Sequence, residues 1–342
     1  MRVIVTGATG NIGTSVVQSL TLEPAVSEII GLARRPTDLR LSKTTFKTVD
    51  IVKDDLVSIF RGADAVIHLA WMIQPARDRE LLESVNIDGS RRVFEAVIRS
   101  QVPHLLVSSS VGAYAPGPKD REVDESWPTT GIQTSLYSRQ KAAVERLLDG
   151  LEYDQPGLKI TRMRPGLSFK RDASAEIKRL FIGRLFPRAM FRKSLIPFVP
   201  GNPDLRFQAV HSSDVGEAFR LALIRQAEGA FNLAASPVLD SNTLARAFEK
   251  KIVPMPSSVL NAMFATSYHL RLQPADPGWL DLALSAPLMS TARATEELGW
   301  VPLYSSVRAL LELFDGLREG EHGATLPLAA SPPASSAVPM IF

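Results

Sequence analysis

Short apolar runs alternate with longer, helically spaced segments along the first half of the chain. The short runs are rich in Val, Ile and Leu, and they predict strands at residues 2–6, 28–32, 46–49, 65–69 and 104–108. The longer segments have the apolar spacing of helices and cover residues 12–20, 54–61 and 80–99. Short, mostly apolar strands are typical of parallel sheets covered on both faces. Because strands alternate with helices, we expect an α/β fold with a doubly wound parallel sheet.

The second half of the chain is less regular. A helix is expected at about 136–152 and a strand at 159–164, and strand and helix patterns return at 207–211 and 214–225. Between and after these elements, prolines are frequent and the helical segments are short. We therefore expect a main domain of residues 1–165 plus about 207–235. A smaller C-terminal lobe would comprise about 166–206 plus 236–318.

The last residues differ from the rest of the chain. From Gly323 to Phe342 there is no charged residue, and four prolines interrupt the segment. Such a composition does not supply a regular element with a polar and an apolar face. We expect residues 319–342 to form a flexible tail.

Composition narrows the class of protein. Of the 342 residues, 45% are hydrophobic and 22% are charged, as in ordinary globular proteins. A net charge of +3 gives no indication of a nucleic-acid partner. Because the chain has no cysteine, disulfides, thiolate metal sites, iron–sulfur clusters and cysteine nucleophiles are excluded. No group of His, Asp and Glu has metal-ligand spacing, so we expect no metal.

The hydropathy pattern also bears on location. Residues 1–7 resemble a strand rather than a signal peptide, because the apolar run is only a few residues long and no cleavage-site pattern follows. No stretch approaches the ~20 apolar residues that are needed to span a bilayer. We expect a cytoplasmic protein that has no membrane partner.

A glycine-rich motif follows the first strand and opens the first helix. It reads Thr6, Gly7, Ala8, Thr9, Gly10, Asn11, Ile12, Gly13. Gly7 permits a tight turn, Gly10 lets a pyrophosphate approach the backbone, and Gly13 lets the helix pack close to the strand. The N-terminus of the helix offers N–H groups and a positive dipole end to phosphates. Since strand, turn and helix occur in this order, we expect the main domain to be a dinucleotide-binding Rossmann domain and the smaller lobe to bind the substrate.

The end of the second strand predicts which dinucleotide binds. An acidic residue there would bind the 2′-hydroxyl of NAD, but this chain has Arg34 and Arg35. Two guanidinium groups fit a 2′-phosphate, so we expect NADP(H), with NAD(H) as the alternative if both arginines are solvated. Asp50, after the third strand, is expected to accept a hydrogen bond from the adenine, and Ile51 to pack beside its ring.

Tyr137 and Lys141 are four residues apart on a predicted helix and therefore share one face. A nearby ammonium lowers the pKa of a phenol, ordinarily about 10, and so makes it a proton carrier near neutral pH. The strand at 104–108 ends in three serines, Ser108, Ser109 and Ser110, and would deliver a hydroxyl to the same crevice. The alternative for Tyr137 and Lys141 is an ordinary pair on a surface helix.

Taken together, the ordered motifs resemble the extended short-chain dehydrogenases/reductases, also called the NAD-dependent epimerase/dehydratase family. The resemblance covers residues 1 to about 315 and rests on the glycine motif, Tyr137 to Lys141, and the sequences at 50–51, 68–70, 86–89, 108–114, 164–166, 210–215 and 297–302. It implies that Ser110 is the catalytic serine, Tyr137 the acid/base, and Lys141 the residue that binds the nicotinamide ribose and tunes the tyrosine. It also implies a homodimer formed through residues 91–98 and 142–148.

The expected cofactor-binding residues lie in the glycine motif, after the predicted strands and on the helix that carries Tyr137. The resemblance adds the backbone of Leu69 and Ala70, and places Pro165 near the nicotinamide. The full set is Thr6, Gly7, Gly10, Asn11, Ile12, Gly13, Arg34, Arg35, Asp50, Ile51, Leu69, Ala70, Ser108, Tyr137, Lys141 and Pro165.

Two positions depart from the nucleotide-sugar members of this family. An arginine usually stands four residues before the histidine that aligns with His211, where this chain has Phe207, with Arg206 one residue away. Residues 274–280 also lack a second arginine expected there. The basic segment at 177–194 is either a lid over an anionic substrate or a solvated face with its phenylalanines turned inward.

These observations predict an NAD(P)-dependent oxidoreductase that transfers a hydride at a secondary alcohol or ketone carbon, with tyrosine as acid/base. One alternative is a nucleotide-sugar (UDP-hexose) 4-epimerase. Another is a non-catalytic NADP(H)-binding sensor, although retention of Ser110, Tyr137 and Lys141 argues for an enzyme. Val111 and Gly112 stand where dehydratases carry acidic residues, which disfavours elimination chemistry.

Overall fold

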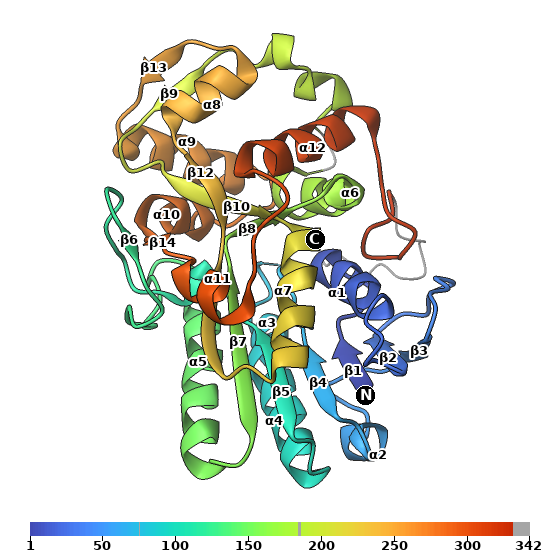
Figure 1. Cartoon of the computed structure of the whole chain (residues 1–342). Helices are drawn as coiled ribbons and strands as arrows, with labels where there is room; N and C mark the ends of the chain where they lie inside the picture. Colours follow the sequence, from blue (N-terminus) through green and yellow to red (C-terminus); the bar gives the residue numbers. More distant parts are fainter. Residues whose placement is uncertain (75, 184–185, 331–342) are drawn as a thin grey trace.

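The computed structural model describes residues 1–74, 76–183 and 186–330 (Figure 1). A sheet of seven strands, all paired in parallel, forms the centre of the larger part, in the order β11-β7-β5-β4-β1-β2-β3. The strands are β1 (Arg2–Thr6), β2 (Glu28–Ala33), β3 (Thr44–Thr48), β4 (Ala65–His68), β5 (His104–Ser108), β7 (Lys159–Pro165) and β11 (Gly229–Leu233). This confirms the predicted α/β fold with a doubly wound parallel sheet.

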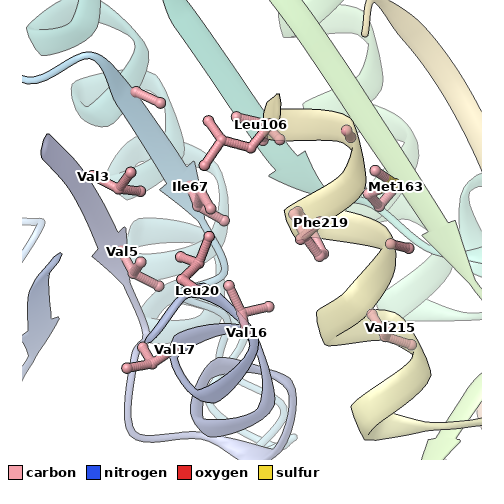
Figure 2. Packing of buried hydrophobic residues seen from close by; sticks show 14 of the residues in the cluster. Val3, Val5, Val16, Val17, Leu20, Ile67, Leu106, Met163, Val215 and Phe219 are labelled. Carbon is pink, nitrogen blue, oxygen red and sulfur yellow. The ribbon is translucent and has the colours of Figure 1, made fainter. Parts of the chain in front are cut away.

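Helices cover both faces of this sheet. On one face lie α1 (Asn11–Thr21) and α7 (Ser212–Arg225), and on the other α2 (Leu56–Phe60), α4 (Gly89–Arg99) and α5 (Leu136–Asp154). Alternate strand residues divide between the two faces. Val3 and Val5 pack with α1 and α7 (Figure 2), whereas Ile4 packs with α2, α4 and α5. All three are fully buried, as expected for a strand covered on both sides.

The helix predicted over residues 80–99 is interrupted. It consists of α3 (Arg79–Glu83), a π-helical turn (Ser84–Asp88) and α4. The turn buries Asn86, whose side-chain amide binds both backbone groups of Met72, at 2.7 and 2.8 Å. A π-turn frequently marks a functional position. Here it fixes the loop that follows β4.

The smaller part of the molecule lies beyond the carboxyl ends of the large sheet (Figure 1). Its strands are β8 (Leu167–Phe169), β10 (Phe207–His211) and β12 (Ala235–Leu239) in one sheet, and the pairs β9 (Val199–Gly201) with β13 (Ile252–Pro254) and β6 (Glu122–Val123) with β14 (Leu288–Met289). Its helices are α6 (Ser174–Ile177), α8 (Ser241–Phe248), α9 (Ser257–His269), α10 (Gly278–Ser285) and α12 (Ser306–Glu319). A further helix, α11 (Ala292–Leu298), packs beside α7 and β11.

Two predictions about chain organisation are corrected. The strand at 207–211 does not rejoin the large sheet, because as β10 it pairs with β8 and β12. The chain returns to the large sheet after α7, where β11 pairs with β7. The tail predicted from residue 319 is held as far as residue 330. Thr325 and Leu328 are 1% and 2% exposed, and the Thr325 hydroxyl donates to the Thr9 carbonyl at 2.7 Å. Burial of these two residues outweighs the loop-like composition; the remainder of the predicted tail, 331–342, lies outside the described residues.

Among the described residues, no helix is both long enough and apolar enough to cross a bilayer.

Candidate active site

The glycine-rich turn is shaped by close backbone contacts. Gly7 has φ +69°, and a Cβ there would lie 2.7 Å from the Ala70 nitrogen. A Cβ on Gly13 would overlap the Gly7 carbonyl oxygen. At Gly10, by contrast, a Cβ would meet only the Gly7 oxygen at 3.5 Å, an ordinary contact. The protein's own packing therefore requires glycine at 7 and 13 but leaves open space over Gly10, which fits a pyrophosphate approaching the N-terminus of α1.

Side chains of the same motif hold the turn in place. The Thr6 hydroxyl lies 2.7 Å from Nδ1 of buried His68 and accepts the N–H groups of Leu69 and Ala70, both at 3.3 Å. Burial lowers the pKa of His68 to about 3, so the ring is neutral at physiological pH. Asn11 donates to the Ser168 carbonyl at 2.9 Å. Thr6 and Asn11 thus position the turn with their side chains, which leaves the backbone to face a phosphate.

The residues expected at the adenosine end lie after β2 and β3. Partial burial lowers the pKa of Arg34, the charge of Arg35 lowers it further, and the charge of Asp50 raises it, so these three groups are neighbours. The Asp50 carboxylate also accepts the Val52 N–H at 3.0 Å. Ile51 is 4% exposed and contributes to the core rather than to an open surface.

Two charged residues of the smaller part, Glu176 and Arg179, lie near Arg35. Burial raises the pKa of Glu176 to about 7, while the charges of Arg179, Lys170 and Arg35 act in the opposite direction. Arg179 binds the carbonyl groups of Pro327 and Ala329. The basic segment at 177–194 therefore comes near Arg35 at Arg179. Its Arg184 lies outside the described residues.

Ser110, Tyr137 and Lys141 come together after β5 and in the first turns of α5. The Ser110 hydroxyl accepts the Gly112 N–H at 3.0 Å and lies near enough to the Tyr137 phenol to affect its pKa. A Cβ on Gly112 would lie 2.7 Å from Cε1 of Tyr137, so glycine is what allows the phenol to pack against this turn. The Lys141 ammonium donates to the Ser108 carbonyl at 2.8 Å and lies 5.9 Å from the centre of the Tyr137 ring. The predicted trio is thus one cluster, with buried Pro165 at the end of neighbouring β7.

The ionisation of this cluster differs from the sequence expectation. Burial raises the pKa of Tyr137 to about 12, although the nearby Ser110 hydroxyl acts in the opposite direction. Burial lowers the pKa of Lys141 to about 7, opposed by the charge of Glu145. The ammonium lies over Trp71, 3.6 Å from the ring centroid, and binds Ser108 instead of the phenol oxygen. Without a ligand, Tyr137 is therefore a protonated acid at neutral pH.

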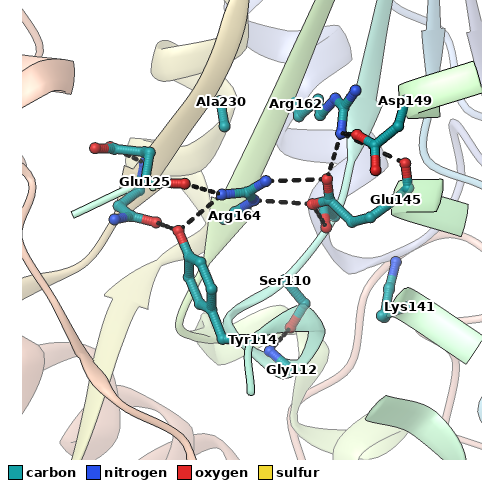
Figure 3. Close-up of polar contacts among 12 residues, drawn as sticks. Ser110, Gly112, Tyr114, Glu125, Lys141, Glu145, Asp149, Arg162, Arg164 and Ala230 are labelled. Atoms are coloured by element: carbon teal, nitrogen blue, oxygen red, sulfur yellow. Dashed lines mark hydrogen bonds and ion pairs between the residues drawn. The ribbon is translucent and has the colours of Figure 1, made fainter. Parts of the chain in front are cut away.

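Sequence reasoning missed a buried ion network behind the trio (Figure 3). Glu145 is 0% exposed; its carboxylate binds Arg162 at 2.8 Å, Arg164 at 2.8 and 3.0 Å, and the Ser109 hydroxyl at 2.5 Å. Arg164 also donates to the Tyr114 hydroxyl at 2.9 Å. Burial alone would raise the pKa of Glu145, but Arg164 and Arg162 hold it at about 2. The spacing of Glu145 in the sequence could have indicated that it lies near the trio, because Tyr137, Lys141 and Glu145 follow each other at intervals of four on one helix face.

Aromatic side chains cover the outer side of Tyr137. The ring of Trp279, from α10, lies 4.5 Å from it at a tilt of 33°, and Trp71 meets it edge-on at 6.0 Å. Phe181 packs edge-on against Trp279 at 4.8 Å. Nothing in the sequence near Trp279 indicated that α10 reaches the tyrosine.

Comparisons with known proteins agree with this fold. Residues 3–234 match the NAD dependent epimerase/dehydratase family. An uncharacterized protein of Mycobacterium tuberculosis is 22% identical over 327 residues, which cover 92% of this chain and 83% of the relative.

Two solved structures share the fold. UDP-glucose-4-epimerase from Stenotrophomonas maltophila, with bound NAD and formylated UDP-arabinopyranose, has a TM-score of 0.69 at 21% identity and covers 94% of this chain and 98% of its own. The UDP-glucose 4-epimerase of Thermus thermophilus, in complex with NAD, has a TM-score of 0.67 at 23% identity and covers 93% and 99%. Since the family match covers more than half of the sequence, the chain belongs to the NAD dependent epimerase/dehydratase family.

Proposed function

We propose that this protein is an NADP-linked oxidoreductase of the epimerase/dehydratase type that acts on a secondary alcohol or ketone. The observation that supports it best is the cluster of Ser110, Tyr137 and Lys141 at the carboxyl ends of the parallel strands, where ligands of such sheets bind. In this proposal the seven-stranded part, residues 1–165 with α7 and β11, binds the dinucleotide. The smaller part binds the substrate.

Each residue of the cluster has a distinct role in the proposed reaction. When bound, the dinucleotide supplies or accepts the hydride at the carbinol carbon. Ser110 would hold the substrate oxygen beside the phenol, and Tyr137 would donate its proton to that oxygen during reduction. Lys141 would bind the nicotinamide ribose, because its ammonium lies one helical turn beyond the phenol. Because its pKa is raised, Tyr137 carries its proton at neutral pH before the reaction.

We propose NADP(H) rather than NAD(H) because Arg34 and Arg35 occupy the position of the ribose-binding acid. Fluorescence titration is expected to give NADPH at least about tenfold tighter binding than NADH. A charge-assisted hydrogen bond contributes about 1.5–3 kcal/mol, so replacing both arginines by serine should weaken NADPH binding by at least roughly tenfold and leave NADH binding little changed. Tenfold tighter binding of NADH to the unaltered protein would contradict the preference.

A substrate screen tests the activity itself. The purified protein would be incubated with NADPH and ketones, or with NADP⁺ and secondary alcohols, while nicotinamide absorbance is followed. Products would also be analysed, because a redox-neutral epimerisation changes no absorbance. Dinucleotide binding without turnover in either assay would favour the sensor alternative.

A UDP-hexose 4-epimerase is the second candidate. It is supported by the likeness to the two epimerase structures and by one observation at α10. The Nε atom of Arg206 is buried and has no hydrogen-bond partner in the described part of the chain. Lys119 lies beside it and donates to the carbonyl groups of Arg206 and Ala283, at 2.9 and 2.8 Å. Two cations therefore lie near α10, although Phe207 stands where an arginine is usual.

The homodimer and the cytoplasmic location remain predictions.

A further inference from the structure

Trp71 and Trp279 pack on the Tyr137 ring and Phe181 packs on Trp279; these three side chains are here called the aromatic wall. Trp279 lies 4.5 Å from the Tyr137 ring, and Trp71 and Phe181 meet the stack edge-on. The Cε1 edge of the Tyr137 ring packs against Gly112. A compound whose carbonyl oxygen reaches the phenol would have the aromatic wall beside its neighbouring atoms.

The pocket beside the wall offers few free polar groups. Most of its lining is apolar or aromatic, and its polar members are Ser135, Gln140 and Asp276. Each of them makes one hydrogen bond within the chain: Ser135 accepts the Ser138 N–H at 3.4 Å, Gln140 accepts the Asn86 amide at 2.8 Å, and Asp276 accepts the Gly278 N–H at 2.9 Å. A hexose carries a hydroxyl on most carbons, and these three polar side chains are too few to replace all of its hydrogen bonds to water.

The wall is held in place by specific contacts. Gln74, in the loop after β4, donates to the Leu180 carbonyl at 2.9 Å and the Pro274 carbonyl at 3.0 Å. It thereby ties the segments that carry Phe181 and Trp279 to the loop that carries Trp71. A Cβ on Gly278 would lie 2.6 Å from the Ser135 Cα, so glycine lets α10 pack directly onto the start of α5. This arrangement sets Trp279 against Tyr137.

From this geometry we infer that the substrate carries an uncharged, apolar ring next to the reacting carbonyl carbon, and that Trp279 and Phe181 determine this specificity. The inference rests on the proposed oxidoreductase function and names its substrate class. A flat ring can stack on or meet the edge of an indole, which adds attraction beyond the burial of its area. A nucleotide sugar would instead bring hydroxyls to the wall.

The test compares ketones that share one carbonyl environment and differ in the attached group. With NADPH present, kcat/KM would be measured for methyl phenyl ketone, methyl cyclohexyl ketone and acetone, and UDP-glucose would be assayed by product analysis. We expect both ring-bearing ketones to exceed acetone by at least tenfold and the phenyl ketone to be the better of the two. We expect no conversion of UDP-glucose.

Variants of the aromatic wall test whether it determines the expected preference for ring-bearing ketones. Trp279→Leu and, separately, Phe181→Leu should reduce the phenyl-to-acetone ratio of kcat/KM by about tenfold, mainly through KM. Phe186→Leu is the matched control, because Phe186 is 39% exposed on the same segment and packs on Phe191 instead of the wall. Its ratio should stay within about twofold of the unaltered protein. Two leucine variants are used so that the test survives if one of them fails to fold.

The outcomes separate this inference from the proposed function. Conversion of UDP-glucose, or higher kcat/KM for acetone than for the ring-bearing ketones, would overturn the inference while retaining an enzyme of this family. Wall variants whose ratio matches that of Phe186→Leu would also overturn it. If no ketone, alcohol or sugar nucleotide is converted, the proposed function fails together with the inference.

Discussion

Tyr137→Phe is expected to reduce kcat/KM by about a hundred- to ten-thousandfold and to leave dinucleotide binding nearly unchanged. The substitution removes only the hydroxyl that would exchange a proton with the substrate, and general acid–base catalysis contributes rate factors of this size. The ring itself keeps its contacts with Gly112 and Trp279, so the fold of the site should persist. Steady-state kinetics on the best substrate of the screen, together with NADPH titration, measures both quantities.

A matched control lies on the same helix. Tyr153 is 88% exposed near the end of α5, so Tyr153→Phe should change neither kcat/KM nor cofactor affinity. Turnover that is equal in Tyr137→Phe and Tyr153→Phe would remove Tyr137 from the mechanism.

Replacing Glu145 by alanine should lower the free energy of unfolding by about 3–5 kcal/mol, because it leaves two buried guanidinium groups without their shared carboxylate. Arg162 and Arg164 are 6% and 5% exposed, and Arg164 also holds Tyr114. The same carboxylate binds Ser109, next to Ser110, so remaining folded protein should also lose activity. Urea unfolding followed by circular dichroism gives the free energy.

The pH dependence of this effect has a definite sign. The pKa of Glu145 is lowered from its usual 4.5 to about 2 in the folded chain. Its contribution to stability is therefore present above pH 4.5 and is lost as the pH falls toward 2. The difference in stability between the unaltered protein and Glu145→Ala should narrow across that range.

Glu152→Ala is the control for this variant. Glu152 also pairs with Arg162, at 2.8 Å, but its side chain is 42% exposed. An exposed ion pair contributes about 0–1 kcal/mol, so the loss should be several times smaller than for Glu145→Ala. Equal losses of unfolding free energy in the two variants would contradict the expectation that the buried Glu145 carboxylate contributes more than the exposed Glu152.

Local sequence patterns predicted the limits of several strands and the position of the glycine-rich turn. The limits of β1, β5 and β10 are those expected from their apolar runs, and the glycine turn lies between strand and helix as its motif requires. β11 was missed, because Gly229–Leu233 is short and contains Asn232 among its apolar residues. The sheet to which β10 belongs could not be read locally, since its partners β8 and β12 are distant in sequence.

In the candidate site too, local patterns predicted some residues, whereas contacts between distant segments were missed. Tyr137 and Lys141 were predicted from their spacing on one helix, and the family resemblance singled out Ser110 among the three serines after a strand. Trp279 was not found, because its contact with Tyr137 joins residues from α10 and α5 and no pattern in either helix encodes it. The expected lowering of the Tyr137 pKa was also wrong for the ligand-free chain, because burial outweighs a lysine whose ammonium is turned to Ser108 and Trp71.

The central claim is that a nicotinamide dinucleotide lies across the carboxyl ends of the parallel strands and ends beside Tyr137. A crystal structure of the protein with NADP⁺ measures this most directly. The claim predicts the pyrophosphate over Gly10 at the start of α1, the 2′-phosphate at Arg34 and Arg35, and the nicotinamide within reach of Ser110 and Tyr137. A dinucleotide bound elsewhere, or a nicotinamide that lies away from the Tyr137 phenol, would contradict it.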